Sequence, residues 1–195
     1  MNAMLDTIMA MIIVGLFILA SFQVDTTMKM NAIYLRYQLH AQQGATVMSD
    51  IVEYDMRKIG HGLRQPLQSI HSADSTQIIF SFSQDVESGY DSIRVNYYTE
   101  TGISQTNPDL IRLHRISGGD HHTYTMGLTS FKLRYFNQRG TELPRPVPSD
   151  SLASIKQIEL DMTFSSKEEI DGERSHAQYH SRITPKNLLV QYGRN

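Results

Sequence analysis

A single acid stands in an otherwise uncharged start of the chain. Asp6 is the only charged residue before Asp25, and most of its neighbours are apolar. A carboxylate inside the hydrocarbon layer of a membrane costs about 2.5–3.5 kcal/mol, and more without a partner. Asp6 is therefore predicted either to be a functional charge with a partner or to lie in the polar headgroup zone with no special role.

The histidines are the next candidates, because imidazole is a common metal ligand. His121 and His122 are adjacent, so on a strand they point to opposite faces and do not easily share a metal ion. His176 and His180 could chelate a metal on a helix. On a strand they would share a face but lie about 13 Å apart. Their surroundings indicate strand or loop, so the sequence predicts no metal site there.

Acidic residues form two further groups. Asp85, Glu87 and Asp91 could supply the oxygen ligands that calcium prefers. A solvated turn is the simpler interpretation, so they are weak candidates only. The acidic run within 168–173 is most simply an exposed loop.

The remaining composition excludes several kinds of chemistry. The chain has no cysteine, which removes disulfides, thiolate catalysis and cysteine-containing zinc sites. It has no nucleophile elbow, phosphate loop or metalloprotease helix, and we predict no enzymatic activity and no cofactor. A membrane-bound enzyme with a cleft assembled from distant residues stays an alternative. The formal net charge is −2 and basic residues are scattered, so no nucleic-acid partner is predicted.

The elements around Asp6 begin with an apolar helix. Residues 3–24 are long enough to span a hydrocarbon core of about 30 Å at about 1.5 Å per residue. We predict that residues 1–24 form a transmembrane or filament-core helix. A core helix or a cleavable signal peptide is the alternative, although no Lys or Arg precedes Lys29 and the signal for cleavage is poor. The side chains predicted to lie in the membrane or filament core are Ile8, Met11, Ile12, Ile13, Val14, Leu16, Phe17, Ile18, Leu19 and Phe22.

The same helix is predicted to continue as an amphipathic segment over residues 25–63. No proline precedes Pro66, and apolar residues recur at steps of three and four. The helix should end near Gly60–Gly62, after roughly 55 residues or about 80 Å. One small domain cannot cover such a helix, so lipid or other chains must bury its first half. The residues predicted to pack on a sheet are Leu39, Met48, Val52, Met56 and Ile59.

From residue 64 to 195 the pattern predicts a soluble, β-rich domain. The apolar period changes to two, and turn residues separate the runs. We expect about six or seven antiparallel strands, with the helix on one face of their sheet, which makes an α+β fold. The clearest predicted strands cover 76–82, 92–99, 110–116, 128–136, 154–164 and 177–183.

Several segments resemble type IV pilins and the pseudopilins of type II secretion, in particular PilW-type minor pilins and J-type minor pseudopilins. Residues 50–60 resemble the family's "D(I/L)R-x-A-G-Y" helix end, and 110–115 its "L-x-R" strand. Residues 127–136 resemble its "V-x-x-L-x-F-x-Y" strand. Residues 155–160 stand where the family has "P-x-x-V-R-V", and 182–188 resemble its closing "V-x-x-R-N-L". The order and spacing of these motifs cover most of the chain.

This resemblance implies a pilin-like fold and a structural role. The chain would be a minor pilin or pseudopilin that waits in the inner membrane with its soluble domain in the periplasm. It would then join other pilin or pseudopilin subunits in an extracellular or periplasmic filament. The family's glutamate, five residues into the mature chain, corresponds to Asp6 when counting starts at Asn2. That acid is expected to pair with the N-terminal amine of a neighbouring subunit.

The chain departs from the family at its start. Family precursors carry a short basic leader that ends in glycine, and no such leader precedes the apolar stretch here. We expect either a longer precursor or an unprocessed start. The alternative function is a single-pass, membrane-anchored β domain that binds a ligand or an envelope partner.

Overall fold

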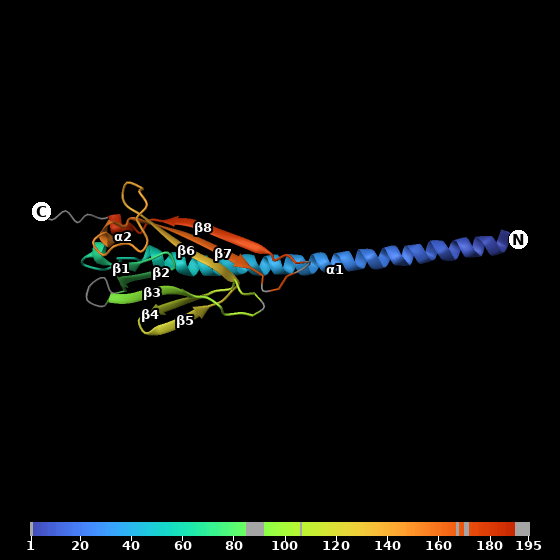
Figure 1. Cartoon of the computed structure of the whole chain (residues 1–195), viewed down its shortest axis with the longest axis horizontal. Helices are drawn as coiled ribbons and strands as arrows, with labels where there is room; N and C mark the ends of the chain where they lie inside the picture. The colour runs from blue at the N-terminus through green and yellow to red at the C-terminus, as the bar shows by residue number, and fades with distance from the viewer. Residues whose placement is uncertain (1, 85–91, 106, 167, 170–171, 190–195) are drawn as a thin grey trace.

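A single helix makes up the first part of the molecule. The computed structural model describes residues 2–84, 92–105, 107–166, 168–169 and 172–189. Helix α1 runs without interruption from Asn2 to Arg57, which corresponds to a length of about 84 Å. Figure 1 shows its first half projecting away from the rest of the molecule, with the N-terminus at the far end.

Two glycines near the expected position end α1. The helix proper stops at Arg57, and tighter turns carry the chain on to Leu63. Gly60 has a φ of 73° and Gly62 a φ of 66°, a left-handed conformation that glycine adopts without steric cost. The Gly60 amide then donates to the Ser81 carbonyl at 3.0 Å, so the end of the helix is joined to a strand.

The described residues after α1 form eight strands in two antiparallel sheets. The five-stranded sheet has the order β1-β2-β3-β4-β5 and the three-stranded sheet the order β6-β7-β8, so neighbours in sequence are neighbours in space. The strands are β1 (Ile70–Ala73), β2 (Gln77–Ser83), β3 (Ser92–Glu100), β4 (Arg112–Ser117), β5 (Asp120–Tyr124), β6 (Leu128–Phe136), β7 (Gln157–Ser165) and β8 (His176–Ile183). Short helices are η1 (Pro66–Gln68), η2 (Leu152–Ser154) and α2 (Lys186–Leu189).

The α+β fold class is as predicted, but the arrangement of strands differs from a single sheet. Strands β1 and β5 were not expected, because neither has an apolar alternation long enough to indicate a strand. Strand β5 forms because Gly118 and Gly119, with φ values of 58° and 101°, make a two-residue turn that returns the chain beside β4. Ser117 consequently pairs with Asp120 in the hairpin.

The last part of α1 lies between the two sheets and shares their core. Its fully buried side chains are Met48, Val52 and Met56, followed by Ile59 just after the helix. The core continues through Phe80 and Tyr97 of the five-stranded sheet and through residues of β6, β7 and β8. In Figure 1 β8 lies on one side of α1 and β3, β4 and β5 lie on the other, while β6 crosses over the helix.

Leu39 does not pack on a sheet as expected, since its side chain is 57% exposed. Leu39 and Met48 are two and a half turns apart, at about 3.6 residues per turn, and therefore occupy opposite faces of α1. The buried face begins instead at Ala41 and continues through Ala45 to Met48. The prediction joined two stripes that lie on different sides of the helix.

Candidate functional site

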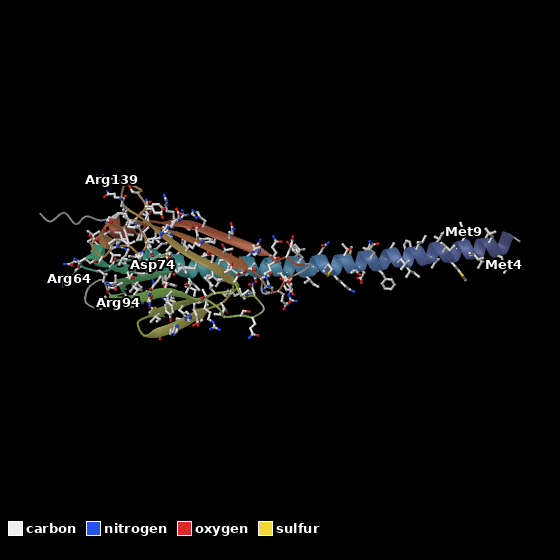
Figure 2. All side chains as sticks on the ribbon, in the orientation of Figure 1. Met4, Met9, Arg64, Asp74, Arg94 and Arg139 are labelled. Atoms are coloured by element: carbon white, nitrogen blue, oxygen red, sulfur yellow. The ribbon has the colours of Figure 1, made fainter. Side chains whose placement is uncertain are left out.

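The apolar half of α1 is the largest exposed hydrophobic surface among the described residues. Figure 2 shows side chains projecting from both edges of this half in the view drawn, with Met4 and Met9 near its tip. Phe17 is 74% exposed and Leu16 is 61% exposed. Apolar side chains of this size in water each forgo about 1.5–3 kcal/mol of burial free energy. The residues predicted to lie in a membrane or filament core are all exposed in this structure: Ile8, Met11, Ile12, Ile13, Val14, Leu16, Phe17, Ile18, Leu19 and Phe22.

Asp6 is exposed on the same helix, two residues before Ile8. It stands on a part of α1 that extends away from the sheets (Figure 1). Its pairing with an amine of another subunit stays a prediction.

A buried charge pair attaches α1 to the five-stranded sheet. The hydroxyl of Tyr97 on β3 donates to Asp55 Oδ2 at 2.7 Å, and Arg115 Nε on β4 donates to the same oxygen at 2.6 Å. The side chains of Asp55 and Arg115 are only 4% and 18% exposed. The pKa of Tyr97 is raised, mainly because the hydroxyl is buried and secondly because the Asp55 carboxylate lies beside it. The hydrogen bond to Asp55 likewise raises the pKa of Arg115, so at neutral pH Arg115 is charged and Tyr97 is neutral.

A second polar contact attaches α1 to the three-stranded sheet. The Tyr179 hydroxyl on β8 donates to Glu53 Oε1, and Arg57 Nη2 donates to Glu53 Oε2 at 2.7 Å. Burial alone would raise the pKa of Glu53, but hydrogen bonds from Ser181, Tyr179 and Arg57 outweigh it and lower that pKa. Together with Asp55, Glu53 ties the helix to both sheets.

Gly44 lets the loop between β5 and β6 lie directly against α1. A Cβ at this position would be 2.4 Å from the Met126 carbonyl oxygen, closer than any side chain can approach. The next loop residue, Gly127, has a φ of 78°, and its carbonyl accepts from the Ser165 amide at 2.7 Å. The two glycines mark the point where α1 enters the space between the sheets.

These contacts divide α1 into a held part and an uncovered part. From Ala41 onward the helix is buried on one face and bonded to both sheets. Before Ala41 its described side chains are exposed, apart from a half-buried Tyr37 that donates to Glu168. The uncovered, apolar part of α1 therefore extends from the β domain in a direction that the contacts of the held part determine.

One cluster on the outer face of the three-stranded sheet brings together groups that could ligate a metal. Glu159, Asp161 and His180 place their ligand atoms within 4.8 Å of one another. Two arginines already neutralise it: Arg134 pairs with both carboxylates, at 3.0 Å to Asp161 Oδ2, and Arg182 lies 3.0 Å from Glu159 Oε2. Two fixed guanidinium groups oppose a divalent cation here, and we interpret the cluster as a charge network.

The sequence did not indicate this cluster, because its members come from two strands, β7 and β8, that are separated in sequence. His180 lies on strand β8, in a segment that was predicted to be a strand. Its partner is Asp161 of β7 and not His176. The register that pairs Asp161 with His180 could be inferred only from a correct pairing of β7 with β8. The calcium candidates Asp85, Glu87 and Asp91 lie outside the described residues.

A long helix, apolar and uncovered at its start and packed against antiparallel sheets at its end, defines a pilin-like α+β fold. Comparison with solved structures gives a match to a type IV-like pilin from Thermus thermophilus, with a TM-score of 0.52 and 11% sequence identity. The match covers 75% of this chain and 96% of the pilin. At this identity the likeness is one of fold. Neither a protein-family model nor a curated protein matches the chain.

The same helix also meets the requirements for a membrane span. Among the described residues, α1 is the one helix long and apolar enough to cross a bilayer, and none of its most apolar window is buried within the chain. This uncovered window lies in the same half of α1 as the exposed apolar side chains.

Proposed function

We propose that this protein is a subunit, minor pilin or pseudopilin in type, of a type IV pilus-like or type II secretion filament. It assembles through the first half of α1. The observation that carries this proposal is an uncovered apolar helix held at a fixed angle on a β domain by contacts to both of its sheets. The order of pilin-like motifs along the chain and the pilin-like fold support the same conclusion.

Before assembly, lipid covers the apolar half of α1. Residues 1–24 then span the inner membrane, residues 25–63 continue the helix, and residues 64–195 form the soluble domain in the periplasm. During assembly the apolar half leaves the lipid and packs against the helices of other pilin or pseudopilin subunits. Lipid tails are as apolar as leucine, so this exchange depends on close packing and polar pairing rather than on the hydrophobic effect.

Asp6 supplies the polar pairing in this scheme. An unpaired carboxylate in an apolar medium is costly, whereas a carboxylate beside an amine of a neighbouring subunit neutralises both charges. The pairing therefore favours one axial register between subunits. The residue type and the position of Asp6 support this role. The role is tested by measuring how well an Asp6 variant is incorporated into filaments.

The experiment compares Asp6→Ala with Asp25→Ala in cells that make filaments. Asp25 is a matched control because it is also an exposed acid on α1, and its ion pair is with Lys29, four residues along the same helix. We expect at least a tenfold drop of the Asp6→Ala protein in sheared filaments, measured by quantitative mass spectrometry, with normal amounts in the membrane. Equal incorporation of the two variants would refute the assembly role of Asp6.

Mass spectrometry of the N-terminus separates the filament subunit from the anchored binding module. A filament subunit of this type has a processed, methylated first residue and is found in the sheared fraction. A protein that keeps an unmodified Met1 and is absent from that fraction is instead a membrane-anchored β domain.

A further inference from the structure

Two histidines from neighbouring strands face each other on the five-stranded sheet. His114 Nδ1 on β4 lies 2.9 Å from His121 Nε2 on β5. The pairing of His114 with Thr123 and of Ile116 with His121 makes the two histidines diagonal neighbours on one face. That face is turned away from α1, because the residues next to His114 and Tyr98, which are Arg115 and Tyr97, bond to Asp55 on the helix.

The His114 ring is held in place from three directions. Glu100 Oε2 accepts a hydrogen bond from His114 Nε2 at 3.1 Å. Tyr98 stacks on the ring with centroids 4.7 Å apart and planes 13° from parallel, and Thr123 Oγ1 lies 3.3 Å from Nδ1. The His114 side chain is only 10% exposed. This packing fixes the ring orientation without any help from His121.

The hydrogen bond to Glu100 also selects the tautomer of His114. A proton on Nε2 leaves the lone pair of a neutral ring on Nδ1, the atom that faces His121. The hydrogen bond from His114, followed by the nearby Arg112, lowers the pKa of Glu100, so the acceptor stays ionised at neutral pH. A carboxylate behind a histidine whose other nitrogen points outward is the arrangement that supports metal-ligating histidines in general.

We propose that His114 Nδ1 and His121 Nε2 form a binding site for a divalent transition metal ion that prefers imidazole, such as Zn²⁺, with Glu100 as the residue that positions His114. Two nitrogens bound at about 2.0–2.1 Å to a tetrahedral ion lie about 3.3 Å apart. His121 needs to move by about 0.4 Å from its present position to reach that separation. It is exposed on the edge strand β5 and can move this far by side-chain rotation.

The charges around this pair differ from those around Glu159, Asp161 and His180. In that cluster two arginines lie directly on the would-be ligand carboxylates. Here Arg112 pairs with Glu100 at 3.3 Å, and Glu100 bonds to His114 Nε2, which is not the proposed ligand atom. Two protein ligands leave further coordination positions open for water or for a donor from another molecule.

The test is a Zn²⁺ titration of the full chain in detergent micelles at pH 7.5, with ¹⁵N-histidine labelling and detection by NMR. We expect saturable binding of one ion, with the resonances of His114 and His121 shifting together. His121→Ala should weaken this binding at least tenfold. The matched control is His122→Ala, because His122 neighbours His121 on the same strand but faces the other side of the sheet.

Glu100→Gln separates a positioning role from a merely structural one. The amide keeps the size of the side chain but removes the charge behind His114, so we expect about tenfold weaker Zn²⁺ binding and an unchanged thermal midpoint. The proposal is overturned if no saturable shift occurs, if His122→Ala weakens binding as much as His121→Ala, or if Zn²⁺ shifts His180 instead. None of these readouts involves filaments, so the result is independent of the proposed function.

Discussion

At the scale of single residues, Asp55 is the charge that α1 contributes to the core. Its Oδ2 accepts hydrogen bonds from both Tyr97 and Arg115, two side chains on neighbouring strands. A buried pair of this kind adds little net stability compared with apolar residues, but removal of one member leaves the other charge without compensation. Asp55 therefore acts mainly by fixing how α1 sits against β3 and β4.

Asp55→Ala should lower the free energy of unfolding by about 3–5 kcal/mol. The reason is that Arg115 stays in a largely buried position without its carboxylate. We expect the double variant Asp55→Ala/Arg115→Ala to be less unstable than the sum of the single variants, as urea unfolding in micelles would measure. Asp50→Ala, on the exposed face of α1, is the control and should change stability by less than about 0.5 kcal/mol. Strict additivity of the two single changes would contradict the buried pair.

Glu53 makes the attachment of α1 to β8 sensitive to acid. Its pKa is lowered in the folded protein, so its stabilising contribution is present above the ordinary carboxyl pKa and is lost as pH falls through the lower, folded value. We expect stability to decline from about pH 5 to pH 3. The Glu53→Gln variant, whose side chain does not titrate, should show a shallower decline in parallel urea titrations. Identical pH profiles would mean that Glu53 has the same pKa folded and unfolded.

At the scale of elements, the entry of α1 between the sheets depends on a close contact. Gly44 of α1 meets the Met126 carbonyl on the loop before β6. Glycine inside a helix costs roughly 0.5–1 kcal/mol relative to alanine, and here it permits a contact that no other residue allows. The held and uncovered parts of α1 meet close to this position.

Gly44→Ala should destabilise the β domain by about 1–2 kcal/mol, because the added methyl group forces the backbone at Met126 to move and this outweighs the gain in helix propensity. Gly15→Ala is the matched control, since a Cβ there meets nothing within 4 Å. Differential scanning calorimetry of both variants measures the effect. A thermal midpoint at or above that of the unchanged protein for Gly44→Ala would contradict the close contact.

Much of this architecture could be predicted from local pattern. The long helix, its end near Gly60 and the strands with clear alternation, such as β3, β6 and β7, follow from residue spacing alone. Strand β5 could not be predicted, because its DHHTY sequence is polar and depends on pairing with β4. The clusters around Glu159 and around His114 also depend on register between strands. Leu39 was misplaced because two apolar stripes on opposite faces of one helix look continuous in sequence.

At the scale of the whole molecule, the described contacts predict a β domain that is stable without the apolar half of α1. The first buried residue of the helix is Ala41, and the described hydrogen bonds between α1 and the β domain involve residues from Tyr37 onward. A protein lacking residues 1–28 should be soluble without detergent, monomeric by light scattering, and unchanged in thermal midpoint within a few degrees. Aggregation or loss of cooperative unfolding would show that the apolar half contributes to the fold.

The central claim is that the apolar half of α1 exchanges lipid for the helices of other subunits. A photo-crosslinking amino acid in place of Phe17, which is 74% exposed, reports its neighbours directly. The same amino acid at Arg139, on the far side of the β domain from the apolar helix (Figure 2), is the control. After irradiation of sheared filaments, we predict that mass spectrometry of the position-17 adducts identifies the N-terminal helix of a pilin-like subunit. Adducts with lipid alone, and none in the filament fraction, would contradict the account.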